Sequence, residues 1–279
     1  MLLRLIRLVQ RLLVLGFGAG IIYLAVWHFF PFFDNRVPLA FALLATYIFT
    51  AYIFIPLVFR VFRLFYVPTH IPLYCVTPDG FASDPINIGV VGTRIQVIKA
   101  MKAAGWHQAD RRTLKNIFKM IRSVVMRSPY PTAPFSSLYL FGRKQDLGFQ
   151  KAFSEDPSQR HHVRFWAAHL NGPEEFHTDV RFWQRFHRPN KDNLSRQLWV
   201  GAASKDIGIV PIRHNAQLTH MIHPDTNAER DLIVHDLRMS HSVAKTITER
   251  VHEGLSLPNR ALRGVLNADG RIRICILKK

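Results

Sequence analysis

The chain has 279 residues, enough for a membrane anchor and one globular domain of ordinary size. It contains 37 Lys and Arg against 19 Asp and Glu, and this net charge of +18 favours anionic partners such as lipid headgroups, phosphorylated metabolites or nucleic acid. The two cysteines, Cys75 and Cys275, show no CxxC or Cys/His spacing, which excludes a zinc ribbon. We interpret both as small buried core residues, with a disulfide between them as the minor alternative.

Two nearly uncharged apolar runs, at about 12–33 and 37–59, are each long enough to cross a bilayer. Because their connection is so short, they are expected to form a helical hairpin. Basic residues flank the outer ends of the two runs, whereas the turn holds only Arg36, beside Asp34; the flanking residues are Arg4, Arg7, Arg11, Arg60 and Arg63. The positive-inside rule therefore predicts a multi-pass anchor over residues 1–63 and a basic domain over 64–279 that faces the cytoplasm.

The elements expected after the anchor follow from apolar periodicity and turn residues. Strands are expected at 71–76, 86–91, 136–151 (with a break near Gly142), 160–168, 196–204, 206–210 and 270–277. Helices are expected from Thr93 to Gly105, within 111–127, and after a strand-like start within 218–240, where Asp225 or Thr226 is the expected cap. Residues 168–195 are expected to form a protruding loop. The pattern predicts an α+β domain with a largely antiparallel sheet, preceded by the two-helix transmembrane hairpin.

The helix expected within 111–127 has an apolar stripe surrounded by basic residues. The stripe contains Leu114, Ile117, Phe118 and Ile121, and the basic residues are Arg112, Lys115, Lys119 and Arg122. In an anchored protein such a helix could lie on anionic lipid. An ordinary surface helix packed on the core is the alternative, and the sequence favours neither.

The segment 160–166, RHHVRFW, places two histidines between arginines in an expected strand. Alternation along a strand puts Arg160, His162, Arg164 and Trp166 on one face and His161, with Val163 and Phe165, on the other. Guanidinium groups match phosphate oxygens, and imidazolium adds a donor, so the first face is suited to an anion. The residues predicted to bind an anion are Arg143, Lys151, Arg160, Arg164 and Ser204. A solvated basic face without a specific pocket is the alternative.

A second set of residues suggests a metal site. His220, His223 and Asp225 form a compact His-x-x-His-x-Asp array, to which His162 could add a third imidazole. Against a metal site, residues three apart in a strand face opposite sides, and Asp225 is also suited to cap a helix. The cofactor is thus unknown, with a divalent metal as an alternative.

The chain contains no Gly-x-Ser-x-Gly, Walker A or His-Glu-x-x-His motif. If the protein is an enzyme, His162 or His220 is the candidate general acid or base, with Arg143, Arg160 and Arg164 holding a phosphate.

Several of these motifs resemble, in order from Asp84 to Leu277, the LssY C-terminal domain family of bacteria. The motifs are PINIGVVGTRIQVIKAMKAAGW, LYLFGRKQDLGFQK, RHHVRFW, LWVGAASKDIGIV, LTHMIHPDTNAERDLIVHDL and DGRIRICIL. The motif positions carried over, without an assigned catalytic role, are Arg143, Gln145, Asp146, Lys151, His161, His162, Arg164, Trp199, Ser204, Asp206, Thr219, His220, Asp225, Glu229 and Arg230. The resemblance implies the bacterial inner membrane and a role near phospholipid or undecaprenyl-phosphate handling. The lipid-phosphatase signatures of modules that often accompany this domain are missing, so their activity does not carry over.

The sequence as a whole favours a membrane-anchored domain that recognises, and could process, a phosphate-bearing lipid or related anion. One alternative is a non-enzymatic accessory domain that binds another polytopic membrane protein through the basic face and the long loop. Another is a metal-dependent hydrolase. Nucleic acid is the least favoured partner, because no RNA- or DNA-binding motif accompanies the charge.

Overall fold

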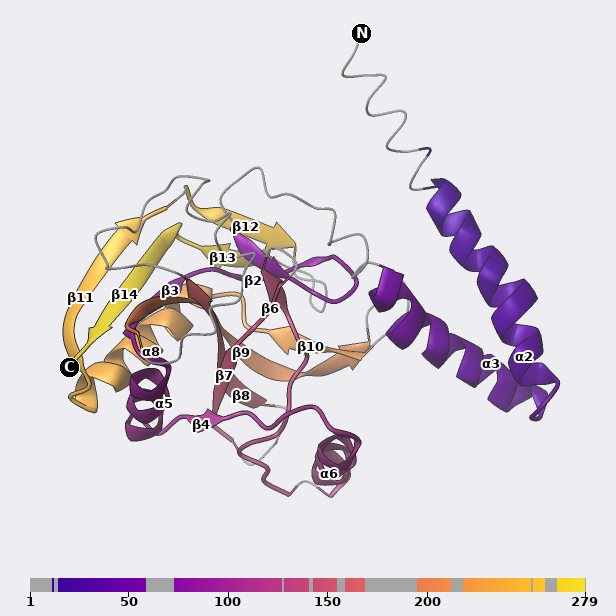
Figure 1. Ribbon diagram of the computed structural model, residues 1–279, viewed down its shortest axis with the longest axis horizontal. Helices are drawn as coiled ribbons and strands as arrows, with labels where there is room; N and C mark the ends of the chain where they lie inside the picture. The colour runs from indigo at the N-terminus through magenta and orange to yellow at the C-terminus, as the bar shows by residue number, and fades with distance from the viewer. Residues whose placement is uncertain are drawn as a thin grey trace, which may run out of the picture. The chain divides into compact units, whose positions relative to one another are not determined.

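The computed structural model shown in Figure 1 describes residues 12, 15–58, 73–126, 128–140, 143–154, 159–168, 195–211, 218–251, 253–258 and 265–278. Its contacts divide the chain into two compact units, Met1–Phe62 and Arg63–Lys279. The boundary between the units lies outside the described residues. The basic residues that flank the outer ends of the apolar runs, and the expected loop apart from its two end residues, also lie outside them.

The first unit contains two long apolar helices, as the sequence predicts. The helical segments Leu15–Asp34 and Leu39–Val58 are each long and apolar enough to cross a membrane. The first includes η1 (Ala25–Phe29) and α2 (Phe30–Asp34), and the second includes α3 (Leu39–Phe49) and η2 (Thr50–Phe54). The short turn between Asp34 and Leu39 makes them a hairpin (Figure 1).

Aromatic side chains join the two helices. The ring of Phe29 lies edge-on to those of Phe49 and Phe54, with centroids 4.7 and 5.0 Å apart. Other large apolar side chains of the pair, such as Ile22 and Phe41, are more than half exposed. A hairpin with apolar side chains turned outward is suited to hydrocarbon rather than water.

The second unit is built around a large sheet whose strand order is β11-β14-β3-β9-β8-β7-β4, with β10 paired to β9. The strands are β3 (Ile88–Gly92), β4 (His107–Gln108), β7 (Leu147–Ala152), β8 (Gln159–Ala168), β9 (Gln197–Pro211), β10 (Leu218–Ile222), β11 (Val243–Arg250) and β14 (Arg271–Leu277). The pairs are antiparallel apart from β14 with β3. The predicted α+β domain with a largely antiparallel sheet is confirmed.

One face of this sheet is covered by α5 (Arg94–Ala103) and α8 (Thr226–Met239) (Figure 1). Val97 and Met101 of α5 and Ile233 of α8 belong to the same buried apolar cluster as Phe165 of β8. Both helices begin where the sequence indicates. The Thr93 side chain accepts a hydrogen bond from the Gln96 backbone in a full capping box, and the Asp225 side chain caps α8.

The other face carries a second apolar cluster and a smaller sheet of order β2-β1-β5-β6. Its strands are β1 (Tyr74–Val76), β2 (Ala82–Pro85), β5 (Tyr139–Leu140) and β6 (Arg143–Lys144). Trp166 of β8 lies in this second cluster, whereas Val163 and Phe165 lie in the first. The predicted alternation of residues 160–166 between two faces is therefore confirmed.

Some elements differ from the expectation or were not foreseen. The expected strands at 196–204 and 206–210 are one continuous strand, β9, because β8 and then β10 pair along its length. Neither β11 nor the two-stranded sheet of β12 (Leu255–Pro258) and β13 (Val265–Ala268) was predicted. Both cysteines are buried and free, as expected.

Candidate functional site

The polar face of β8 is a buried network of charged groups rather than a solvated surface. Arg160 and Arg164 are about 5% exposed or less, and His162 is 2% exposed. Antiparallel register places Arg160 opposite Asp206 of β9 and His162 opposite Ser204. The alternation that the sequence shows, together with this register, brings these two polar pairs and Arg164, which lies opposite Ala202, onto one face.

Two carboxylates neutralise these basic groups. Asp84 of β2, 1% exposed, accepts a hydrogen bond of 2.7 Å from Arg164 Nη1 and lies 3.3 Å from His162 Nε2. Asp206 Oδ2 lies 3.5 Å from Arg160 Nε and 3.3 Å from His162 Nδ1. The network therefore ties the small sheet to β8 and β9.

His220 of β10 reaches the same carboxylate, since its Nδ1 lies 3.3 Å from Asp206 Oδ2. Its side chain is 26% exposed, so it lies at the edge of the buried network. The structure thus brings together Arg160, His162, Arg164, Ser204 and His220, five of the residues that the sequence singles out.

The charges of this network shift one another's pKa values. Burial raises the pKa of Asp84, but the opposing effect of Arg164 and His162 is larger, so the pKa lies below its ordinary value. Burial likewise opposes ionisation of Asp206, yet His162, His220 and Arg160 hold its pKa below the ordinary value.

The two histidines shift in opposite directions. For His162, burial lowers the pKa, but Asp206 and Asp84 outweigh burial and leave it raised. For His220, Asp206 raises the pKa, but burial and the charges of Arg160, His162 and Arg164 together bring it below the ordinary value. The network therefore favours protonation of His162 and disfavours protonation of His220.

Ser204, His162 and Asp206 form a chain of contacts like that of a nucleophile, base and acid. The Ser204 hydroxyl lies 2.8 Å from His162 Nε2, and His162 Nδ1 faces Asp206. However, Ser204 is 0% exposed and neither partner exceeds 2%. A substrate cannot reach this hydroxyl in the structure.

Phe135 covers the network from outside. The centroid of its ring lies 4.6 Å from the Arg164 guanidinium carbon and 5.8 Å from the centroid of the His162 ring. The ring also lies on Gly148 of β7, where an added Cβ would come within 2.4 Å of Phe135 Cζ. Only glycine at this position lets the ring approach the strand so closely.

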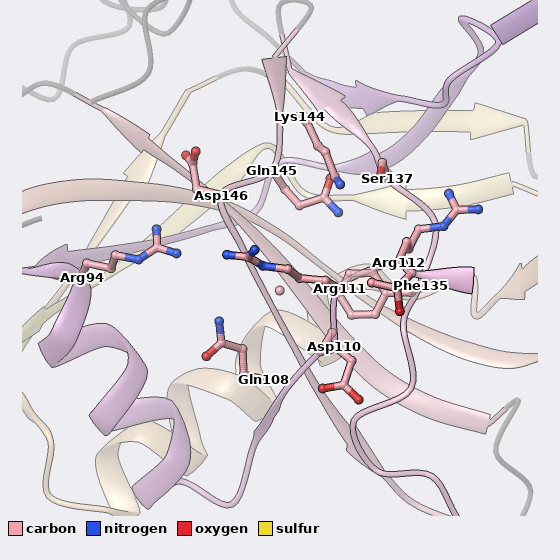
Figure 2. A pocket seen from close by; sticks show the side chains of 13 residues that line it. Arg94, Gln108, Asp110, Arg111, Arg112, Phe135, Ser137, Lys144, Gln145 and Asp146 are labelled. Carbon is pink, nitrogen blue, oxygen red and sulfur yellow. The ribbon is translucent and has the colours of Figure 1, made fainter. Parts of the chain in front are cut away.

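On the outer side of Phe135 lies a pocket of about 520 Å³ with a basic lining. Its lining includes Arg94, Arg111, Arg112 and Lys144, which come from α5, from the segment before α6 (Leu114–Val125) and from β6. Figure 2 shows Arg94 and Arg111 extending toward each other across the pocket. None of these four side chains makes an ion pair with a carboxylate among the described residues.

Both carboxylates in the pocket wall are already engaged. Asp110 accepts hydrogen bonds from the hydroxyls of Tyr130 and Thr132, at 2.7 and 2.9 Å. Asp146 pairs with Arg143 and accepts a hydrogen bond from the Ala167 backbone. The four basic side chains outnumber these two carboxylates, one of which is also paired with Arg143, so the pocket keeps a net positive charge. Burial, and then the charge of Arg112, lower the pKa of Lys144. An anion in the pocket would stabilise the protonated form of this side chain.

The other predicted site residues lie elsewhere or are already engaged. Besides its pair with Asp146, Arg143 donates to the Ala167 carbonyl at 3.1 Å. Lys151 pairs with Asp236 of α8 at 2.9 Å, on the helix-covered side. His161, predicted to be a hydrogen-bonded core histidine, lies 2.7 Å from Glu229 of α8 and is largely buried.

The predicted metal ligands do not converge. His220 turns to Asp206, whereas His223 Nδ1 accepts a hydrogen bond from the Asp225 backbone at 3.2 Å, and the Asp225 side chain caps α8. In the part of the chain that the structure describes, no three His, Cys, Asp or Glu side chains are arranged to hold a metal ion.

Sequence reasoning missed most of the pocket. Arg94 was read only as part of a helix and Arg112 as part of a basic helix face, and Arg111 drew no functional interpretation. The one available signal was the surplus of charge, including the adjacent Arg111 and Arg112 before the helix cap Thr113. Nothing local indicates that they meet Arg94 and Lys144.

Comparisons with known proteins bear on the fold and site together. No curated protein and no solved structure matches the chain. A model of one protein family, described as LssY C-terminus, matches residues 68–261. This match covers most of the chain, including the buried network and the pocket, and it agrees with the resemblance of the sequence motifs. The chain belongs to the LssY C-terminus family.

Proposed function

We propose that this protein recognises the phosphate group of an anionic lipid, or of a related phosphate-bearing compound, in the pocket outside Phe135. The observation that carries the proposal is the convergence of Arg94, Arg111, Arg112 and Lys144 on one pocket whose two carboxylates are engaged elsewhere. Guanidinium groups match phosphate oxygens in pairs, and the ammonium group adds a point charge. The volume of about 520 Å³ suits a headgroup.

This proposal keeps the predicted chemistry but moves it to other residues. The arginines of β8 are paired with Asp84 and Asp206, and they would have to leave these buried partners to bind an anion. Polar groups beside the basic residues, among them Gln108 and Ser137, add further hydrogen-bonding capacity to the pocket. The proposal is confined to recognition, because Ser204, which contacts His162 in the buried network, is fully buried.

We also propose that the hairpin anchors the protein in a bacterial inner membrane, with the basic domain on the cytoplasmic side. Support comes from the two apolar helices and from the basic residues at their outer ends. In this location the domain would meet anionic lipid headgroups continuously.

The test uses the full chain in nanodiscs of phosphatidylcholine, titrated calorimetrically with soluble dibutanoyl phosphatidic acid, with inorganic phosphate and with dibutanoyl phosphatidylcholine. We expect binding of dibutanoyl phosphatidic acid, of inorganic phosphate or of both, and no binding of dibutanoyl phosphatidylcholine. The preference between the two distinguishes a lipid headgroup from free phosphate as the ligand. Loss of one charged hydrogen bond, worth about 1.5–3 kcal/mol, should weaken binding roughly tenfold to hundredfold in an Arg94→Gln or Arg111→Gln variant.

The matched control is Lys245→Gln, which removes an exposed cation of β11 that is not among the pocket residues. This variant should bind the same ligands with the affinity of the unaltered chain. Equal affinity of the pocket variants and the unaltered chain would show that the anion binds elsewhere. Failure of both dibutanoyl phosphatidic acid and inorganic phosphate to bind would refute the proposal.

A further inference from the structure

The helix α6 turns its apolar side chains away from the domain. Leu114 and Val125 are 76% exposed, Phe118 is 69% exposed and Ile121 is 49% exposed. Their spacing of four, three and four residues places them in one stripe along the helix. Four large apolar side chains on a single stripe are too many for an ordinary water-facing surface.

The opposite side of α6 contains its buried residue, the polar Ser123, near the C-terminal end of the helix. Ser123, 4% exposed, donates a hydrogen bond to the Ser128 carbonyl. At 3.6 residues per turn, Ser123 lies roughly half a turn around the helix axis from Leu114. A helix packed on the core as an ordinary surface helix would have the reverse arrangement, so the structure does not support that alternative for α6.

A basic stripe borders the apolar one. Lys115, Lys119 and Arg122 follow each other at four and three residues, and α6 contains no acidic residue. The ammonium group of Lys119 lies 4.0 Å from the centre of the Tyr130 ring, which ties this side of the helix to the domain. Apolar side chains beside a row of cations match a surface that offers hydrocarbon below negative charge.

We infer that α6 is a second membrane contact, which inserts its apolar stripe into an anionic lipid bilayer while its basic stripe meets the headgroups. The described N-terminal unit, with two helices suited to a bilayer, would keep the domain close to such a surface. Arg111 and Arg112 of the pocket immediately precede the helix cap Thr113. Docking of α6 therefore holds two pocket residues at headgroup level. The inference does not depend on anion binding in the pocket, because it is argued from the exposed apolar and basic side chains of α6.

The test places a fluorescent label on α6 in the full chain, reconstituted into vesicles of phosphatidylcholine with or without phosphatidylglycerol. Phe118→Cys carries the label, and Ile95→Cys, half-exposed on α5, is the matched position. The unaltered chain measures background labelling, since Cys75 and Cys275 are buried. Insertion to about 5–10 Å should let shallow lipid-borne quenchers reduce emission from position 118, but not from position 95.

Two further variants separate the contribution of the basic stripe of α6 from that of the pocket. Lys115→Glu with Arg122→Glu should abolish quenching at position 118, because the reversed charges repel anionic lipid. Arg94→Gln with Lys144→Gln, which alters the pocket alone, should leave that quenching unchanged, so failure of the pocket proposal and failure of this inference give different results.

Full access of an aqueous quencher to position 118 in anionic vesicles would overturn the inference. Protection from water without lipid quenching, growing with the protein density in the vesicles, would also overturn it and would assign the stripe to a second copy of the chain. Lipid quenching that raised salt reduces would support it, since salt screens the basic stripe.

Discussion

At the scale of single residues, two aspartates decide what the basic side chains of β8 can do. Asp84 and Asp206 are each 1% exposed, and they form the ion pairs that neutralise Arg160, His162 and Arg164. Removing one partner of such a buried set leaves an uncompensated charge, which costs far more than the loss of an exposed pair. The network is therefore expected to hold the small sheet on the large one.

Replacement of Asp206 tests this role. Asp206→Asn leaves Arg160 without its carboxylate in the structure and is expected to cost about 3–5 kcal/mol. For a domain of this size the melting temperature should fall by roughly 6–20 °C. Tryptophan fluorescence of the full chain in detergent can follow it, since Trp106, Trp166 and Trp199 are buried in the domain.

The comparison is Asp231→Asn, at a carboxylate that is 42% exposed. Its partner Arg230 keeps Asp269, and its other partner, Arg273, is itself 35% exposed. The cost of this substitution should stay below about 1 kcal/mol. If the two variants had the same melting temperature, the ion pairs of Asp206 would contribute no more to stability than the exposed pair does.

At the scale of elements, the ring of Phe135, in the segment before β5, packs on Gly148 of the strand β7. Phe135, 7% exposed, separates the buried network from the basic pocket, and Gly148 of β7 makes room for its ring. The ring cannot move away without uncovering Arg164 and His162. The contact thus links the packing of β7 to the shape of the pocket.

Gly148→Ala should break this contact, because the added methyl group overlaps the Phe135 ring. Overpacking of this kind costs about 1–3 kcal/mol. We expect a lower melting temperature together with weaker binding of dibutanoyl phosphatidic acid, as the displaced ring alters the pocket wall.

Gly254→Ala is the matched substitution, since its added Cβ would lie at an ordinary 3.5 Å from the Ala268 carbonyl oxygen. It should change neither property. Unaltered stability and binding in Gly148→Ala would mean that Phe135 can shift freely and does not define the pocket.

At the scale of the whole molecule, the proposed orientation has a direct consequence. The short turn between the two apolar helices should face away from the cytoplasm, because the basic residues gather at the other ends. Asn35→Cys, in that turn, should react with a membrane-impermeant maleimide added to intact bacteria. Lys245→Cys, on β11, should react only after permeabilisation.

The unaltered chain again gives the background from its buried cysteines. Labelling of Lys245→Cys in intact cells, with Asn35→Cys protected, would place the domain on the outer side. Labelling of neither position before permeabilisation would mean that the turn does not reach the outer side of the membrane.

Much of the fold could be predicted because its signals are local. The uncharged runs give the two apolar helices, Thr93 and Asp225 give helix starts, and the alternation of residues 160–166 gives the two faces of β8. By contrast, β11 is a largely exposed edge strand, so its residues carry no strong apolar period. Its place depends on pairing with β14 at the far end of the chain.

The sequence by itself determined the two apolar helices, the basic surplus, the order of most elements and the residue types on the polar face of β8, because these follow from residue types at fixed spacings. Only the tertiary structure decided which charges remain available. Asp84 and Asp206 reach the arginines of β8 from distant positions, whereas Arg94, Arg111 and Lys144 meet in a pocket without such partners. It also decided which side of α6 faces the domain. Charge compensation depends on contacts between residues far apart in the chain, which no local pattern records, and the orientation of α6 depends on packing that its own periodicity leaves open.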